Sequence, residues 1–210
     1  MNASPKAQNT MSNSQNPALI LASTSQYRRE LLERLRIPFE VISPKVDETP
    51  FTGESTLDLA LRLAQAKAAA VAKEHPHAWV IGSDQVADLC GAAIGKPGNF
   101  ERALAQLQLM RGATVTFHTA LCLMKGDVQT TLSIPTDVTF RKLPDSALES
   151  YLLAEEPYDC AGSAKSEGLG IRLLEAIKSD DPTALIGLPL IALTGLLRDA
   201  GFAIPSKNIE

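Results

Sequence analysis

Carboxylates that could bind a cation or move a proton stand at two places in the chain. Asp84 follows an apolar run and a glycine, so the sequence predicts a carboxylate at the carboxyl end of a strand, where α/β proteins usually bind ligands. Asp47 and Glu48 lie in a polar loop upstream of it. Carboxylate oxygens suit a hard divalent cation, and we expect these three to converge on one site. The alternative for each residue taken singly is an ordinary solvated side chain.

Two arginines open a predicted helix after Ser25, although the start of a helix already carries positive partial charge. Arg29 has Glu33 four residues later, which predicts an ordinary exposed ion pair. Arg28 shares the apolar face of the helix and lies beside the unpaired N–H groups of its first turn, a place that suits a bound anion. The alternative is that Arg28 pairs with a carboxylate of the same chain and that Ser23 or Ser25 only caps the helix.

Two lysines are further candidates for contact with an anion. Lys67 falls at the edge of the apolar stripe of a predicted Ala-rich helix, so it either points into a site or extends its ammonium along the surface to solvent. The segment from Gly91 to Pro97 is not a phosphate loop, because three residues instead of four separate its glycines and no Ser or Thr follows the lysine. Lys96 stays a candidate for an isolated phosphate contact.

Composition excludes several classes of protein. The 210 residues are 45% hydrophobic and 21% charged, with no run near the ~18 apolar residues of a membrane span. The three cysteines are widely spaced and include no CxxC pair, so the sequence supports neither a disulfide framework nor a zinc knuckle. The net charge of −4 gives no general attraction to nucleic acid or an anionic membrane. We expect a cytoplasmic protein with neither of those partners.

The hydrophobic pattern predicts strands that alternate with helices. The predicted strands cover residues 19–21, 39–42, 79–82, 115–124, 135–140 and 171–177. The predicted helices cover residues 26–35, 55–74, 99–110, 145–154 and 189–200. The hairpin-like stretch 115–140 is too short for a parallel crossover, so we expect an α/β fold with a mixed sheet and flanking helices.

The ends of the chain differ from the rest. Residues 1–17 are rich in Asn, Ser and Gln and lack the apolar stretch of a secretory signal, so they predict a disordered tail. One folded domain is expected over residues 18–204, followed by a short tail over residues 205–210.

Six short segments resemble, in order, those of the Maf-like nucleoside triphosphate pyrophosphatases. They are Leu21-Ala22-Ser23-Thr24-Ser25 with Arg28-Arg29, Val46-Asp47-Glu48-Thr49, Gly82-Ser83-Asp84-Gln85, Gly95-Lys96-Pro97, Ala161-Gly162-Ser163 with Lys165-Ser166-Glu167-Gly168, and Ile186-Gly187-Leu188-Pro189. The resemblance implies an inosine-triphosphatase-like fold with a cleft between two lobes, a cytoplasmic location and often a homodimer. It also implies a small-molecule nucleotide substrate, hydrolysed between its α- and β-phosphates with Mg²⁺ or Mn²⁺.

The resemblance also assigns catalytic roles by position. Asp84 would be the general base that activates water, and Glu48 with Asp84 would bind the divalent metal. Lys67 and Lys96 would neutralise phosphate charge.

Other positions would bind the substrate and choose its base. Ser23 and Arg28 would receive the triphosphate. Gln85, the block around Glu167 and the aromatic Tyr27 resemble the branch of the family that hydrolyses 7-methyl-GTP. The methylated purine is cationic, so we expect Tyr27 to stack on it, Glu167 to accept hydrogen bonds from it and Gln85 to complete the contacts.

Two other functions remain open at this point. The first is a pyrophosphatase for another nucleotide, such as UTP or dTTP, which would differ at the base-contacting positions. The second is a nucleotide-binding regulator of cell division, suggested by the family's association with division arrest, which would not need a general base. If 7-methyl-GTP is the substrate, we expect a role in clearing modified species from the nucleotide pool.

Overall fold

A seven-stranded mixed sheet forms the centre of the computed structural model, which describes residues 16–204. The strands are β1 (Leu19–Ala22), β2 (Glu40–Ile42), β3 (Trp79–Leu89), β4 (Ala92–Ile94), β5 (Thr114–Lys125), β6 (Val128–Phe140) and β7 (Leu174–Ser179). Their order is β2-β1-β3-β5-β6-β7, with β4 paired to β3. β1 runs parallel to β2 and β3, and the other pairs are antiparallel. The predicted mixed sheet is confirmed.

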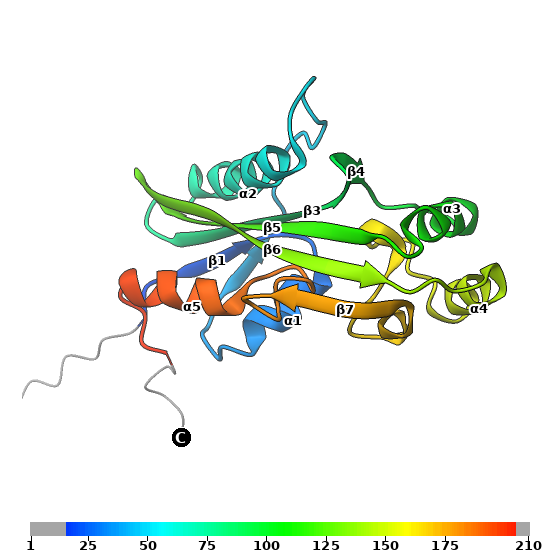
Figure 1. The fold of residues 1–210 in the computed structure, drawn as a ribbon. Coiled ribbons are helices and arrows are strands. Elements are labelled where there is room, and N and C mark those ends of the chain that lie inside the picture. Colours follow the sequence, from blue (N-terminus) through cyan, green and yellow to red (C-terminus); the bar gives the residue numbers. More distant parts are fainter. Residues whose placement is uncertain (1–15, 205–210) are drawn as a thin grey trace, which may run out of the picture.

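Helices flank this sheet on both faces and at one end (Figure 1). They are α1 (Gln26–Glu33), α2 (Thr56–Ala72), α3 (Phe100–Met110), α4 (Asp145–Glu155) and α5 (Leu190–Asp199), with short 3₁₀ turns η1 (Ala161–Ser163) and η2 (Leu169–Leu173). Side chains cap two of these helices at their N-termini: the backbone N–H of Arg28 donates to Ser25, and that of Arg102 donates to Asn99. No helix among the described residues is long and apolar enough to cross a membrane.

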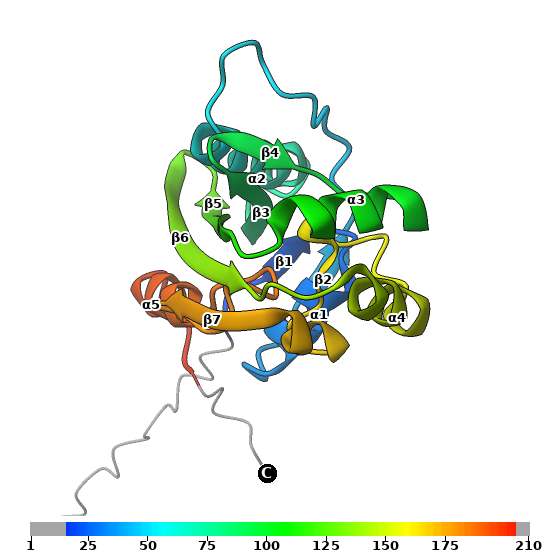
Figure 2. The ribbon, with the colours of Figure 1, turned by 45° about the vertical axis from the view of Figure 1, so that its right-hand side comes forward.

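Three hydrophobic clusters make up the core. One lies between α2 and the sheet, and a second lies on the opposite face with α1 and α5. The third holds α3, α4 and η2 against the far ends of the long strands, where Figure 2 shows α3 and α4 together. The cleft between two lobes that the resemblance implies stays a prediction.

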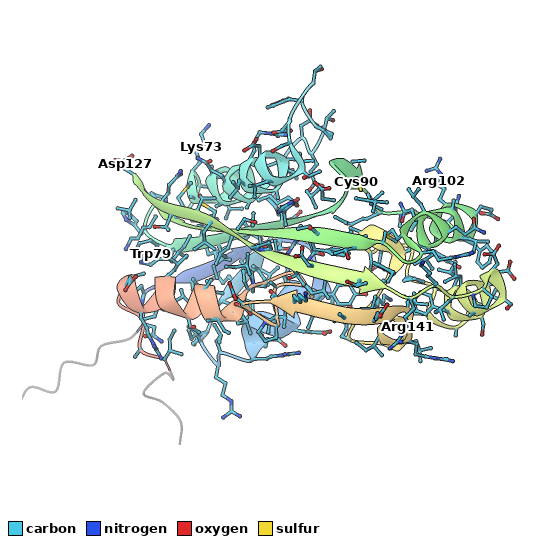
Figure 3. All side chains as sticks on the ribbon, viewed as in Figure 1. Lys73, Trp79, Cys90, Arg102, Asp127 and Arg141 are labelled. Atoms are coloured by element: carbon cyan, nitrogen blue, oxygen red, sulfur yellow. The ribbon has the colours of Figure 1, made fainter. Side chains whose placement is uncertain are left out.

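β3 is longer than the sequence predicted. The three polar residues after Gly82 indicated the end of a strand, yet β5 pairs with nearly all of β3 and supplies backbone partners through that stretch. Figure 3 labels Trp79, the first residue of β3, and Cys90, which follows its last residue, at well-separated points along the sheet. Asp84 therefore lies in mid-strand opposite Ala120, and the prediction of a carboxylate at a strand end was wrong.

Three other elements differ from the predicted ones. β4 was not predicted as a strand, and β6 begins seven residues before the predicted residue 135 because the whole β5–β6 hairpin is paired. The predicted strand 171–177 is the turn η2 followed by β7. The predicted tail 1–17 lies mostly outside the described residues, and Asn16 accepts a 2.9 Å hydrogen bond from the backbone of Ala203.

Candidate active site

Gly82 brings α2 unusually close to β3. A Cβ atom built at this position would lie 2.1 Å from the carbonyl oxygen of Ala64 and 2.7 Å from the backbone nitrogen of Ala68. Only glycine therefore allows this approach of helix and strand. Side chains two apart on a strand share a face, so Asp84 also faces α2, where it meets Lys67.

Lys67 bridges two of the three carboxylates that the sequence singled out, Glu48 and Asp84. Its Nζ lies 2.6 Å from Asp84 Oδ1 and 2.7 Å from Glu48 Oε1. The side chains of Lys67 and Asp84 are 8% and 10% exposed, while that of Glu48 is 58% exposed. The lysine points into a charged cluster and does not extend to solvent, which settles the choice between its two interpretations.

The charge of Glu48 reflects the basic residues around it. Burial alone raises the pKa of this carboxyl, but the hydrogen bond from Lys67 and the charges of Lys67, Lys96 and Arg28 hold it below its usual value. Lys96 is exposed just after β4, and its charge acts on Glu48. Glu48 is therefore an anion at neutral pH, with basic side chains around it.

A gap in strand pairing opens beside Asp84. β1 pairs with β3 only as far as Ala22 and Gly82, and β4 begins to pair on β3 at Ala87. Between these points no strand of the described part of the chain covers that edge. The chain after β1 turns there into α1, with the buried Ser23 accepting a 3.1 Å hydrogen bond from the backbone of Ser25. This turn carries Arg28 toward the cluster.

Arg28 contributes a guanidinium without an ion pair. Its Nε donates a 2.9 Å hydrogen bond to the carbonyl oxygen of Gly187, and no carboxylate of residues 16–204 lies within 4.0 Å of it. Burial lowers the pKa of Arg28, and the charges of Asp84 and Glu48 oppose that effect. The remaining N–H donors of this half-buried side chain suit an anion better than they suit a partner within the chain.

The opposite face of β3 holds a buried polar seam. Ser83 Oγ donates to the Gly187 carbonyl at 3.0 Å, and Gln85 Nε2 lies 3.0 Å from the carbonyl oxygens of Ala184 and Leu185. Thr119 Oγ1 accepts from Gln85 at 2.9 Å. The amide N–H groups of Gln85 are thus engaged inside the protein, so only its oxygen is left for a base contact, which stays a prediction.

Tyr27 faces the segment that carries Glu167. Its hydroxyl lies 3.5 Å from Asp159 Oδ2, and Lys165 Nζ lies 5.9 Å from the ring centroid. Burial raises the pKa of Tyr27, so the phenol stays neutral at pH 7. Glu167 is exposed and accepts a 3.4 Å hydrogen bond from Ser166, with no direct contact to Tyr27.

Sequence reasoning missed some residues near these sites. Lys165 lies in one of the six family-like segments but had no predicted role, and Asp159 lies outside all six. Arg62 had no predicted role in the site. Contacts across a loop or between distant segments leave no periodic signal in the sequence, so only the three-dimensional structure reveals them.

The donor set fits a divalent metal only in part. Asp47 accepts a hydrogen bond from the backbone of Thr49 within its own loop, and no group of three His, Cys, Asp or Glu side chains within residues 16–204 could hold a metal ion. The predicted three-carboxylate set is therefore not formed. Glu48 and Asp84, joined through Lys67, still match a Mg²⁺ site of one or two carboxylates that takes its other ligands from phosphates and water.

Comparison with known proteins gives consistent matches. The family model described as Maf-like protein matches residues 18–200. Proteins named 7-methyl-GTP pyrophosphatase are 63% identical in Cupriavidus metallidurans, 64% in Burkholderia thailandensis and 61% in Bordetella avium. These alignments cover 91%, 90% and 89% of this chain, and 98%, 90% and 95% of the relatives.

A solved structure, that of the Staphylococcus aureus Ham1 protein, aligns with a TM-score of 0.42 and 17% identity, over 60% of this chain and 72% of that one. The family model covers nearly the whole folded region, and the alignments to the named relatives extend across it. The chain belongs to the family of Maf-like proteins.

Proposed function

We propose that this chain is a nucleoside triphosphate pyrophosphatase that hydrolyses 7-methyl-GTP to 7-methyl-GMP and pyrophosphate. The observation that carries the proposal is the name shared by relatives 61–64% identical over about nine-tenths of the chain. The charged cluster of Glu48, Lys67, Asp84 and the unpaired Arg28 supports the same chemistry.

Phosphate binding falls to the basic side chains. Arg28 offers N–H donors that have no partner carboxylate in the described chain, and Lys96 adds a positive charge that acts on Glu48. Lys67 forms ion pairs with two carboxylates, so its positive charge lies inside the site but is offset by their negative charges. A triphosphate brings the negative charge that the crowded start of α1 lacks, and Ser23 at the same turn adds a hydroxyl.

Water activation falls to Asp84. Its Oδ1 accepts from Lys67, which leaves Oδ2 to accept the proton of a water molecule. The water oxygen forms a bond to the α-phosphorus, the bond from that phosphorus to the bridging oxygen breaks, and pyrophosphate leaves with the electron pair. The proton held on Asp84 then passes to solvent.

Glu48 and Asp84 would hold a divalent metal, Mg²⁺ or Mn²⁺, which supplies neutralisation of phosphate charge when bound. The low pKa of Glu48 keeps that ligand ionised. Tyr27, Glu167 and the oxygen of Gln85 would contact the base, since the cationic 7-methylguanine ring favours an aromatic face and a carboxylate.

The proposal also covers the location, the partners and the oligomeric state of the enzyme. We place the enzyme in the cytoplasm, where it clears a modified nucleotide from the pool, with no nucleic-acid or membrane partner. A homodimer is part of the proposal, and light scattering of the purified protein tests it.

The decisive experiment measures pyrophosphate release by the purified protein with magnesium. The substrates are 7-methyl-GTP, GTP, UTP, dTTP and CTP, each also offered to the Asp84→Asn variant. We expect release dominated by 7-methyl-GTP, reduced about 10²- to 10⁴-fold in the variant. Preference for another nucleotide would overturn the base assignment but keep the chemistry, and no release from any would favour the regulatory function.

A further inference from the structure

The loop that carries Glu48 has little of its own structure to hold it in place. Residues 43–55 connect β2 to α2 without a helix or strand, and the loop projects beyond the end of α2 near the top of Figure 1. Glu48 is more than half exposed, and its contact with the body of the protein is the 2.7 Å ion pair with Lys67. A single ion pair from an exposed side chain does not fix the position of this loop, so other contacts must do so.

Arg62, about one and a half turns before Lys67 on α2, fastens the loop. Its Nε lies 2.5 Å from Glu54 Oε1, and its Nη2 lies 2.8 Å from Glu54 Oε2 and 3.1 Å from the carbonyl oxygen of Thr49. The guanidinium also lies 4.0 Å above the ring of Phe51. One side chain therefore holds three points of the loop, and the first of them directly follows Glu48.

Glu54 completes this clamp from within the loop. Its Oε2 accepts a 3.0 Å hydrogen bond from the backbone of Phe51, and its side chain is 8% exposed. The bidentate geometry with Arg62 is the strong form of an Arg–carboxylate contact. Such a planar fork orients the loop as well as attaching it, which a single-point contact from lysine cannot do.

We propose that Arg62 is a positioning residue, which fixes the loop of residues 47–54 on α2 so that Glu48 is held at Lys67 and Asp84. This inference rests on the proposed function, in which Glu48 takes part in the chemistry. It goes beyond that function because the contacts of Arg62 are with the loop and not with Asp84 or Lys67. The alternative is that Arg62 and Glu54 form an ion pair that stabilises the fold and has no bearing on Glu48.

A double-mutant cycle separates these alternatives. The variants are Arg62→Gln, Glu48→Gln and the double variant, with kcat and KM measured for each. We expect Arg62→Gln to lower kcat/KM about tenfold or more in the wild-type background, and less than about twofold once Glu48 is gone. Equal fold-losses in both backgrounds would overturn the proposal, as would full activity of Glu48→Gln.

Hydrogen exchange supplies a readout that needs no activity. We expect the amides of residues 47–54 to exchange about tenfold faster in Arg62→Gln, with the strands of the sheet unchanged. Unchanged exchange in this loop would overturn the proposal even if the enzyme is inactive on every nucleotide, so its failure is distinct from that of the proposed function.

Two further variants test the same interpretation, one from the loop side and one as a control. Glu54→Gln removes the clamp from the loop side and should reproduce both effects if Arg62→Gln fails to fold. Arg111→Gln removes a comparable Arg–carboxylate pair, with Asp145, between α3 and α4. It should leave kcat/KM and the exchange of residues 47–54 unchanged, and the same losses in this control would contradict the proposal.

Discussion

Arg28 Nε donates a 2.9 Å hydrogen bond to the carbonyl oxygen of Gly187, a residue 159 positions later in the chain. The same oxygen accepts from Ser83 at 3.0 Å, so one carbonyl joins α1 to the centre of β3. Gly187 has φ of +126°, a backbone conformation open to glycine and costly for other residues. The direction of the candidate phosphate-binding arginine thus depends on a glycine outside the helix that carries it.

We predict that Gly187→Ala impairs substrate binding. The new methyl group would meet Arg28 only at ordinary contact distances of 3.6 and 3.7 Å, so the damage comes from the backbone, at about 1–3 kcal/mol. As this carbonyl moves, Arg28 loses its acceptor, and we expect a several-fold higher KM for the nucleotide.

A matched control for that variant is Gly201→Ala. Gly201 also has positive φ, at +87°, but a Cβ there would have open space and no contact with the site. It should lose comparable stability in urea unfolding with KM unchanged. Equal KM changes in both variants would contradict the role given to Gly187.

We predict that Gly82→Ala damages both stability and catalysis. The Cβ atom would strike backbone atoms of α2, which cannot rotate away as a side chain could, so the helix must shift at a cost of about 1–3 kcal/mol or more. That shift moves Lys67 away from Asp84, and we expect kcat to fall along with the free energy of unfolding.

Gly195→Ala is the control for this effect. Gly195 lies inside α5, where an added methyl group would meet only open space, and alanine favours a helix by about 0.5–1 kcal/mol. We expect a small gain in the free energy of unfolding and the wild-type kcat. A Gly82→Ala protein with wild-type kcat would show that close packing of α2 does not position the lysine.

Local signals in the sequence were enough for the start of α1. The cap of α1 by Ser25 and the pair of Arg29 with Glu33 at 3.0 Å concern neighbours on one helix. Short-range spacing determines such contacts, so a pattern of residue types can predict them. The position of Lys67 at the edge of its apolar stripe left its direction open, because its partners Glu48 and Asp84 lie outside α2.

Contacts between distant segments were beyond that kind of reasoning. The polar residues of β3 are paired because β5, 34 to 38 positions later in the chain, lies beside them, and hydropathy alone made them look like the end of a strand. Gln85 was expected to face a ligand, yet carbonyl oxygens of Ala184 and Leu185 take up its amide. Tertiary contacts decide whether a polar side chain is free to bind a ligand, and the spacing of residues in the sequence does not reveal those contacts.

We predict that Glu167→Gln weakens the preference for the methylated base. The substitution keeps the size of the side chain but removes the charge that favours a cationic ring, a difference of about 1–2 kcal/mol for charged over neutral hydrogen bonding. The ratio of kcat/KM for 7-methyl-GTP to that for GTP should fall several-fold, with GTP itself little affected. Glu175→Gln, an exposed acid on β7, should leave the ratio unchanged. An intact ratio in Glu167→Gln would overturn this account of base choice.

We predict that the clamp on the Glu48 loop weakens in acid. The hydrogen bond from Arg62 lowers the pKa of Glu54 from 4.5 to about 2, although burial acts in the opposite direction. A carboxyl with a depressed folded-state pKa contributes stability above its unfolded pKa, and that contribution is lost as the pH falls toward the folded one.

The test compares wild type with Glu54→Gln in urea unfolding from about pH 6 to about pH 3. The wild type should be the more stable at the upper end, and the difference in free energy of unfolding should narrow steadily below about pH 5. Glu33→Gln is the control, because Glu33 also pairs with an arginine but at the exposed surface of α1. A difference between wild type and Glu54→Gln that stays constant across the range would mean that the ionised carboxylate of Glu54 is not what holds the loop.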